Sequence, residues 1–389
     1  SPLHPSPDFG RGDGGEGFSG GTMNICIPKE RRPFEYRVGL SPAGVEILTN
    51  MGHTVYVEHE AGVGAGFSDR EYEKAGARLV YSGEEIYGRA DLLTKIARPL
   101  KEELDWLREG CAMMGFLHLA SARRDKLDIL LQKKVTSIAY EQVQLADGSR
   151  PVLRTFSQMC GAMSAQIAAR YLQNNWGGKG ILLGGMPGVP PAEVAILGAG
   201  VVGTYATQTF LGLGAHVIVL DNRLTALQRL SDRFPGVSTM IATRRNLERV
   251  TSFVDVLVGA ALVPGERTPQ LVTRAMVQAM KPRSVIIDID IDEGGCVETA
   301  RPTVHDHPTY VEEGVIHYCV PNIPGVVART ATHAFVNAAM PFIMEVAEKG
   351  ADAAIAESPA IEAAVNTHAG KMSHLGRLTV NKEVEDGLD

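Results

Sequence analysis

A glycine-rich run is the part of this chain whose residue types and spacing indicate chemistry most clearly. Residues 198–203 read Gly-Ala-Gly-Val-Val-Gly, after an apolar run at 194–197 and before a helical stretch at 204–213. A second apolar run then ends on Asp221, close to the spacing of about 20 residues expected for an acid after such a loop. This order of strand, glycine loop, helix, strand and acid predicts a βαβ unit that binds a dinucleotide.

Each residue of the loop has a physical task in such a unit. Gly198 permits the tight turn, Gly200 lets a pyrophosphate approach the backbone, and Gly203 lets the helix pack close to the strand. The N-terminus of the helix that follows offers free N–H groups to the phosphates, and Val201 and Val202 of the loop are expected to contact the cofactor as well. All five residues are therefore expected to bind the cofactor.

The acid after the second strand decides which cofactor is preferred. A carboxylate at Asp221 accepts hydrogen bonds from both ribose hydroxyls and repels a 2′-phosphate, which favours NAD over NADP. Arg223 follows closely and leaves NADP open as the alternative. The sequence thus predicts NAD as the cofactor.

Composition excludes several kinds of partner. The length of 389 residues predicts two domains, and the formal charge of −7 argues against nucleic acid or an anionic membrane surface as a partner. No apolar stretch approaches the roughly 18 residues of a membrane span. The 5 cysteines include no C-x-x-C pair and are expected to be reduced thiols in a cytoplasmic protein.

The elements that must position these residues alternate between strand and helix signals, which predicts an α/β fold of two Rossmann-like, doubly wound domains. Strands are expected at residues 24–27, 54–57, 91–96, 113–117, 136–139, 194–197, 216–220, 238–241, 255–258 and 284–288. Long helices are expected at 158–175 and 332–349, and the second is expected to return to the first domain.

The expected division follows from this order. Residues 1–22 are rich in Gly, Ser and Pro and are expected to be a disordered leader or tag. A discontinuous substrate domain is expected at 23–150 and 328–389, with the NAD-binding domain at 151–327. Ligands of such folds bind at the carboxyl ends of the strands.

Several irregular motifs resemble alanine dehydrogenases and the NAD-binding subunit of nicotinamide nucleotide transhydrogenases. They include Phe-Leu-His-Leu-Ala at 116–120, Ser-Ile-Ala-Tyr-Glu at 137–141 and Gly-Gly-Met-Pro-Gly-Val at 184–189. Further matches lie at residues 27–30, 35–38, 262–265, 288–296, 306–308 and 367–368. The resemblance implies a discontinuous substrate domain beside an NAD domain, and a homo-oligomer that is expected to be a hexamer.

The resemblance also assigns roles to three residues. Arg37 matches the arginine that holds the substrate carboxylate, for which its guanidinium offers two parallel hydrogen bonds. His118 matches the catalytic histidine of alanine dehydrogenases, which moves a proton, and transhydrogenase subunits lack it. Asp292 matches the aspartate that orients water and the nicotinamide ribose. Without the resemblance, they read as a surface arginine, a core histidine and a solvated loop acid.

One position departs from the family pattern. Alanine dehydrogenases have a substrate-binding lysine where this chain has Ala97, and transhydrogenase subunits also lack it. Lys95 could replace it, because residues two apart share a face of a strand, and Arg98 is the other candidate. Asp290 adds an acid where the family has a small residue. These changes favour a substrate bulkier than alanine or one with a cationic group.

The resemblance implies further contacts with the cofactor. They are expected from Ser157, Asn222, Leu262, Ile289, Asn322 and Ile323, together with Asp292. The run His305-Asp306-His307 resembles a metal pair, but the family carries Asp-His-Pro without a metal, so no metal is expected.

The combined prediction is an enzyme that oxidatively deaminates an L-amino acid, alanine or a related one, to the 2-oxo acid and ammonium with NAD, reversibly. A saccharopine-type enzyme, which condenses an oxo acid with another amine, is a second possibility within the same class. The alternative from another class is an NAD(H)-binding subunit of the transhydrogenase type. His118 favours the dehydrogenase and Ala97 favours the subunit.

Overall fold

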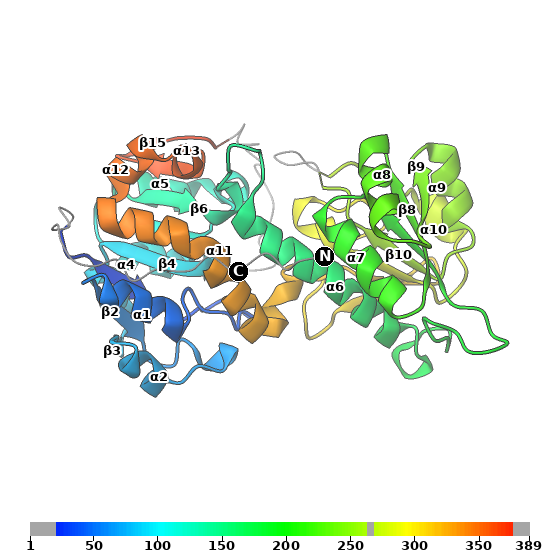
Figure 1. Cartoon of the computed structure of the whole chain (residues 1–389), viewed down its shortest axis with the longest axis horizontal. Helices are drawn as coiled ribbons and strands as arrows, with labels where there is room; N and C mark the ends of the chain where they lie inside the picture. Colours follow the sequence, from blue (N-terminus) through cyan, green and yellow to red (C-terminus); the bar gives the residue numbers. More distant parts are fainter. Residues whose placement is uncertain (1–20, 263–267, 376–389) are drawn as a thin grey trace, which may run out of the picture.

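Two mainly parallel β-sheets organise the chain, and helices cover both faces of each sheet (Figure 1). The structure, a computed structural model, describes residues 21–262 and 268–375. Each sheet with its helices forms one lobe, and we call them the first and the second lobe in chain order. This confirms the predicted α/β fold of two doubly wound units. The leader expected at 1–22 lies outside the described residues except for its last two positions.

The first lobe contains an eight-stranded sheet in the order β15-β14-β6-β5-β4-β1-β2-β3. Its strands are β1 (Asn24–Ile27), β2 (Thr54–Glu58), β3 (Arg78–Val80), β4 (Leu92–Ala97), β5 (Ala112–Phe116), β6 (Thr136–Ala139), β14 (Val365–His368) and β15 (Lys371–Met372). Its helices are α1 (Pro42–Asn50), α2 (Asp69–Lys74), α3 (Gly83–Arg89), α4 (Lys101–Trp106), α5 (Arg124–Gln132), α11 (Ala328–Lys349), α12 (Ala351–Glu357) and α13 (Pro359–Glu362).

The second lobe contains a seven-stranded sheet in the order β12-β13-β11-β10-β7-β8-β9. Its strands are β7 (Glu193–Leu197), β8 (His216–Asp221), β9 (Ser238–Ile241), β10 (Val256–Gly259), β11 (Val285–Asp288), β12 (Thr309–Glu312) and β13 (Val315–Tyr318). Its helices are α6 (Pro151–Tyr171), α7 (Val201–Gly212), α8 (Leu224–Arg233), α9 (Arg244–Thr251) and α10 (Arg274–Gln278).

Burial on both faces explains why the strands read as continuous apolar runs. In the first lobe, Ile25 and Ile27 of β1 belong to one apolar cluster, whereas Cys26 belongs to the cluster on the opposite face. In the second lobe, Val194 and Ala195 of β7 divide in the same way. Parallel sheets need helices on both faces because neither face can be left to water.

The last described strands complete the first sheet. β14 pairs antiparallel with β6, with Val365 opposite Ile138, and β15 pairs antiparallel with β14. The C-terminal part of the chain therefore returns to the first lobe, as the predicted discontinuous fold requires. The boundaries at residues 150 and 328 stay predictions, since α6 and α11 pack on each other where the lobes meet.

The two long helices begin earlier than the sequence predicts. α6 starts at Pro151 instead of 158, because a proline is well suited to the first helical turn. It crosses from the first lobe to the second in Figure 1. α11 starts at Ala328 instead of 332, directly after the 3-10 helix η6 (Ile323–Val327). None of the described helices has the length and apolar character that crossing a bilayer requires.

We expect Gly161→Ala to destabilise the protein. A Cβ at Gly161 of α6 would lie 2.3 Å from the carbonyl oxygen of Val202 in α7, so the two helices would have to move apart. The matched control is Gly88→Ala in α3, where a Cβ meets nothing within 4 Å, and which should stabilise by about 0.5–1 kcal/mol. Urea unfolding measures both, and equal stabilisation by the two variants would contradict the close contact.

Candidate active site

The glycine-rich loop joins β7 to α7 in a turn that requires glycine. Gly198 has a φ of +107°, and a Cβ on it would lie 1.9 Å from the carbonyl oxygen of Ala260. A Cβ on Gly203 would lie 1.8 Å from the carbonyl oxygen of Gly198. These two glycines therefore serve the turn and the close packing of α7 on the sheet.

Gly200 has a different environment, because it faces open space. It is the N-cap of α7, and a Cβ on it would meet nothing within 4 Å. It lines a cavity of about 770 Å³ together with Val201 and Ser157, two other residues predicted to bind the cofactor. The free N–H groups and positive end of the helix suit phosphate oxygens. The residues present thus fit the pyrophosphate of a dinucleotide.

Asp221 ends β8 and is engaged by the protein. Its Oδ2 accepts a hydrogen bond from the backbone N–H of Ala199 at 2.7 Å, and its Oδ1 accepts one from the N–H of Arg223 at 2.8 Å. The Arg223 guanidinium adds a longer contact of 3.3 Å. Burial opposes ionisation of Asp221, but these hydrogen bonds outweigh it and hold its pKa below the usual value.

Arg37 is held by a buried ion pair. Its Nε and Nη2 donate to the two carboxylate oxygens of Glu35, and Nη2 also donates to Oδ1 of Asn322 at 2.6 Å. Nη1 makes no hydrogen bond within the described residues, yet it is not among their buried unpartnered polar atoms. Glu35 and Asn322 therefore leave only the Nη1 group of Arg37 available to a substrate carboxylate. This differs from the expected pair of parallel hydrogen bonds from two nitrogens.

His118 follows β5 in a left-handed turn with φ of +43°. Its backbone N–H donates to Oε1 of the buried Glu141 at 2.7 Å, and the N–H of Leu117 donates to the other carboxylate oxygen. The His118 side chain is exposed and stacks on Phe116. Glu141 thus fixes the backbone from which the His118 imidazole projects. Sequence reasoning did not assign a role to Glu141, although its place in the 137–141 motif could have indicated one.

Asp292 lies in the 3-10 helix η5 (Ile289–Glu293), directly after β11, as the strand pattern predicts. Its side chain is exposed, yet the protein around the carboxylate still removes enough water to raise the pKa of Asp292. The charge of His118 and the backbone N–H of Asn322 oppose this increase. Asn322 therefore contacts Arg37 through its side chain and Asp292 through its backbone. Asn322 thus links Arg37 to Asp292, and His118 lies near enough to Asp292 for its charge to act on that carboxylate.

Sequence reasoning missed Cys160, which it treated only as a structural thiol. Burial and the nearby carboxylate of Asp292 raise the pKa of Cys160 to about 12, and Arg37 and Asp290 also act on it. Cys160 of α6 therefore lies near enough to both Arg37 and Asp292 for their charges to act on it. Nothing in its sequence neighbourhood distinguishes it from the other cysteines, because only the crossing of α6 between the lobes brings it there.

The remaining predicted cofactor residues share one edge of the second sheet. Asn222, Leu262, Ile289 and Ile323 follow the carboxyl ends of β8, β10, β11 and β13, and Val202 lies in the first turn of α7. The parallel strands direct these ends to the same edge, where ligands of such sheets bind. The rest of the 262–265 motif lies outside the described residues.

Comparison with known proteins agrees with this geometry. The profile "Alanine dehydrogenase/PNT, N-terminal domain" matches residues 26–160, and "Alanine dehydrogenase/PNT, C-terminal domain" matches residues 164–375. Alanine dehydrogenases of Methanococcus maripaludis and Mycolicibacterium smegmatis are 45% and 43% identical to the chain. Each alignment covers 90% of this chain, with 95% and 94% of the relative. The chain belongs to the alanine dehydrogenase/PNT family.

Solved structures of the family superpose over most of the chain. An L-alanine dehydrogenase has a TM-score of 0.88 and 41% identity, and the match covers 92% of this chain and 99% of that one. A transhydrogenase from Sinorhizobium meliloti has a TM-score of 0.79 and 26% identity, over 90% and 100% of the two chains. The resemblance read from the motifs is confirmed.

Lys95 lies in a buried network within the first lobe. Its Nζ is 3.1 Å from both carboxylate oxygens of Glu103 and from the Tyr87 hydroxyl, and 3.5 Å from Glu30. The β4–β5 register is irregular between Thr94 and Ala97, so the two-residue period that the prediction used is interrupted. Lys95 therefore neutralises buried carboxylates, and the structure does not bring it together with Arg37.

Arg98 is the candidate that lies beside the family histidine. Its Nη1 donates to the carbonyl oxygen of His118 at 3.4 Å, while its own carbonyl oxygen accepts from Arg32 Nε at 2.8 Å. Ala97 itself pairs in register with Phe116 of β5, two residues before His118. Of the two predicted substitutes for the family lysine, the structure thus places Arg98 next to the expected substrate site.

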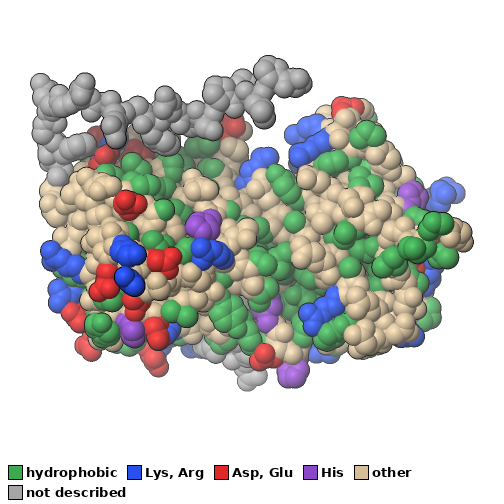
Figure 2. Space-filling model, turned by 60° about the horizontal axis from the view of Figure 1, so that its bottom comes forward, with side chains coloured by type: hydrophobic (Ala, Val, Ile, Leu, Met, Phe, Trp, Pro, Cys, Tyr) green, Lys and Arg blue, Asp and Glu red, His purple; other side chains and the backbone are tan. Residues whose placement is uncertain are grey.

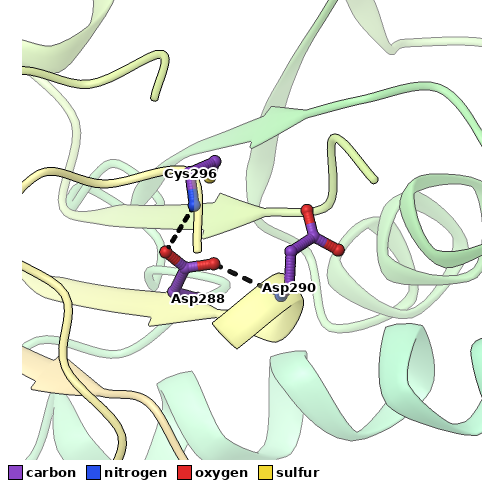
Figure 3. Close-up of side chains that lie close together, drawn as sticks. All are labelled: Asp288, Asp290 and Cys296. Atoms are coloured by element: carbon purple, nitrogen blue, oxygen red, sulfur yellow. Dashed lines mark hydrogen bonds between the residues drawn. The ribbon is translucent and has the colours of Figure 1, made fainter. Parts of the chain in front are cut away.

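Asp288, Asp290 and Cys296 form a candidate metal-binding group in the described part of the chain, shown in Figure 3. The carboxylate of Asp288 accepts hydrogen bonds from the backbone N–H groups of Cys296, Val297 and Asp290, so it acts as a cap for the loop. The Asp290 carboxylate points away from both and accepts from the N–H of Ala261 after β10. Both carboxylates are therefore engaged by backbone N–H groups of the loops around them.

His305 and His307, which resemble a metal pair in the sequence, lie near the 3-10 helix η6 and strand β12. The His305 ring contacts Phe34 at a tilt of 55°, and its Nε2 is buried without a partner among the described residues. Burial lowers the pKa of His305, against the effect of nearby Asn322 and Glu35. The candidate metal group of the described residues includes neither His305 nor His307.

Alanine substitutions in the glycine loop should separate folding from binding. We expect Gly198→Ala to lower stability by several kcal/mol, because its Cβ meets backbone and its φ is positive. Gly200→Ala should unfold nearly as the wild type does but lose the thermal stabilisation by NADH, since its Cβ projects into the cavity. Thermal unfolding with and without NADH measures both. Full NADH stabilisation of Gly200→Ala would contradict this placement.

Asp290 should make stability depend on pH. Burial, followed by the charge of Asp288, raises its pKa from 3.8 to about 7. At pH values between 3.8 and about 7, the Asp290 carboxyl is protonated in the folded state but ionised in the unfolded state. The contribution of Asp290 to stability therefore falls as pH rises through this range. We expect Asp290→Asn to gain on the order of 1 kcal/mol or more relative to wild type at pH 8, and little at pH 4. Urea unfolding at both pH values tests this, with the exposed Asp105→Asn as control. A gain that is independent of pH would contradict it.

Proposed function

We propose that this protein catalyses the reversible, NAD-dependent oxidative deamination of L-alanine or a closely related amino acid to the 2-oxo acid and ammonium. The observation that carries the proposal is the link from Arg37 to Asp292 through Asn322, with His118 near Asp292, in a chain whose glycine loop fits a dinucleotide. Relatives named alanine dehydrogenase that are 42–45% identical over 90% or more of the chain support it.

The reaction requires each of these groups in a different way. Bound NAD supplies the acceptor for the hydride that leaves the substrate Cα. Arg37 holds the substrate carboxylate through Nη1, and Glu35 and Asn322 keep the guanidinium in place. His118 removes the proton of the substrate ammonium group, and Asp292 orients the water that adds to the resulting imine. Ammonia then leaves and the 2-oxo acid is formed.

The side chain of the preferred amino-acid substrate depends on the residues around position 97. Ala97 lacks the cation of the family pattern, and Arg98, whose Nη1 donates to the carbonyl oxygen of His118, is the candidate to replace it. A substrate that is bulkier than alanine, or that carries its own cation, would suit a site without this lysine. The amino-acid preference of the enzyme therefore depends on position 97.

A transhydrogenase-type subunit is the alternative. The higher identity of the alanine dehydrogenase structure, 41% against 26% for the transhydrogenase, favours the dehydrogenase. The exposed imidazole of His118, which that alternative does not need, does so as well. We further propose a homo-oligomer, expected as a hexamer, and a cytoplasmic location, which the 5 free cysteines support.

The test is NADH formation by the purified protein with a panel of amino acids. We expect turnover of L-alanine, and a loss of about 100-fold or more in kcat for His118→Ala. Ala97→Lys should lower the KM for alanine about 10–100-fold, because it adds a charge-assisted hydrogen bond to the substrate. Ala275→Lys, exposed on α10, is the matched control and should change nothing.

Two outcomes would change the assignment. Turnover of another amino acid, with alanine accepted only by Ala97→Lys, would mean that position 97 has altered the specificity. NADH binding without turnover of any amino acid by either protein would overturn the dehydrogenase and favour the transhydrogenase-type subunit.

A further inference from the structure

The cavity beside the glycine loop has an unusual charge. Five arginines line it: Arg150, Arg154, Arg223, Arg229 and Arg233. Asp147 is the only acid among its described lining residues. The adenosine half of NAD carries its charge on the pyrophosphate, which the loop and the start of α7 already suit. The cavity therefore offers more positive charge than NAD requires.

Most of these guanidinium groups have no carboxylate partner. Within the described residues, Arg150, Arg154, Arg229 and Arg233 form no ion pair. Arg229 donates to a backbone oxygen of its own helix at 3.3 Å, and Arg233 contacts the amide of Gln208 at 3.4 Å. Arg229 and Arg233 are four residues apart on α8, so their side chains share one face of that helix. An anionic ligand would meet several unneutralised donors.

Asp221, the acid expected to repel a 2′-phosphate, does not face the cavity. It is 6% exposed and absent from the lining, and its two oxygens accept hydrogen bonds from Ala199 and Arg223. The Arg223 side chain is 62% exposed and does line the cavity. The group that the cavity presents beside β8 is therefore a guanidinium instead of a carboxylate.

We propose that this cavity accepts a ribose 2′-phosphate, so that the protein binds and uses NADP(H) in addition to NAD(H). Arg223 is the residue expected to hold the phosphate, with Arg229 and Arg233 of α8 adding charge from the same wall. A guanidinium suits a phosphate because it donates two parallel hydrogen bonds. Hydride transfer to NADP rests on the proposed function, whereas binding of NADPH does not.

The distribution of charge over the surface agrees with this site. Figure 2 shows that acidic side chains gather on the left-hand lobe of this face, whereas Lys and Arg side chains prevail on the right-hand lobe. The right-hand lobe is the second lobe, which contains α7 and α8 (Figure 1). The arginines that line the cavity attract a dinucleotide with an additional phosphate, and the attraction weakens with salt.

The experiment measures dissociation constants of NADH and NADPH from nicotinamide fluorescence with the purified wild type, Arg223→Ala and Arg223→Lys. We expect wild-type constants for the two dinucleotides within about tenfold of each other. Arg223→Ala should raise the constant for NADPH about 10–100-fold relative to that for NADH, since it removes a charged hydrogen bond and frees Asp221. Arg223→Lys should restore part of the loss. Arg245→Ala, exposed on α9 away from the cavity lining, should change neither constant.

A second measurement separates this inference from the proposed function. Adenosine 2′-phosphate should compete with NADPH in the wild type and lose this ability in Arg223→Ala. NADH binding and amino-acid oxidation with NAD, together with NADPH binding more than about 1,000-fold weaker than NADH, would overturn the inference and leave the dehydrogenase standing. NADPH binding without turnover of any amino acid would support the site and overturn the proposed function.

Discussion

The buried ion pair of Arg37 and Glu35, with its link to Asn322, is the interaction on which the site depends. Burial opposes ionisation of Glu35, but Arg37 and Asn322 hold its pKa below the usual value, so the pair stays charged. Removing one member of such a pair costs about 3–5 kcal/mol, because the other charge is left buried. Asn322, in a left-handed conformation with φ of +56°, turns its side chain to Arg37 and its N–H to Asp292. One residue of the second lobe thereby links Arg37 to Asp292, the residues that we propose bind the carboxylate and orient water.

Sequence pattern predicted the parallel strands well, because both faces of each are buried and each is a continuous apolar run. β1, β2, β6 and β9 lie within one residue of their expected bounds. The strands that were missed lie at or next to the sheet edges, where β3 and β15 are short and pair on one side only. Their apolar signal is too brief to be distinguished from a loop. The glycine loop was predictable because it needs particular residues at fixed spacing.

The partners of charged side chains were not predictable in the same way. Lys95 was expected to approach the substrate, but Glu103 and Glu30 take its charge, and only the fold brings them there. Asp221 was expected to face the ribose, but the sequence did not show that its carboxylate also accepts hydrogen bonds from the N–H groups of Ala199 and Arg223. Residue type and strand position gave the location of each group. Its direction depends on hydrogen bonds to residues that are distant in sequence, and on an irregular register between β4 and β5.

The pairing of β14 with β6 has a consequence for the order in which the protein is made. In the first sheet, β6 has no partner on its outer side until the residues of β14, 365–368, have been synthesised. All strands of the second sheet precede residue 319. During translation, the second lobe can therefore close while the first still exposes an unpaired edge at β6. The residues that line the cavity beside the glycine loop all precede residue 234, so they are synthesised well before β14.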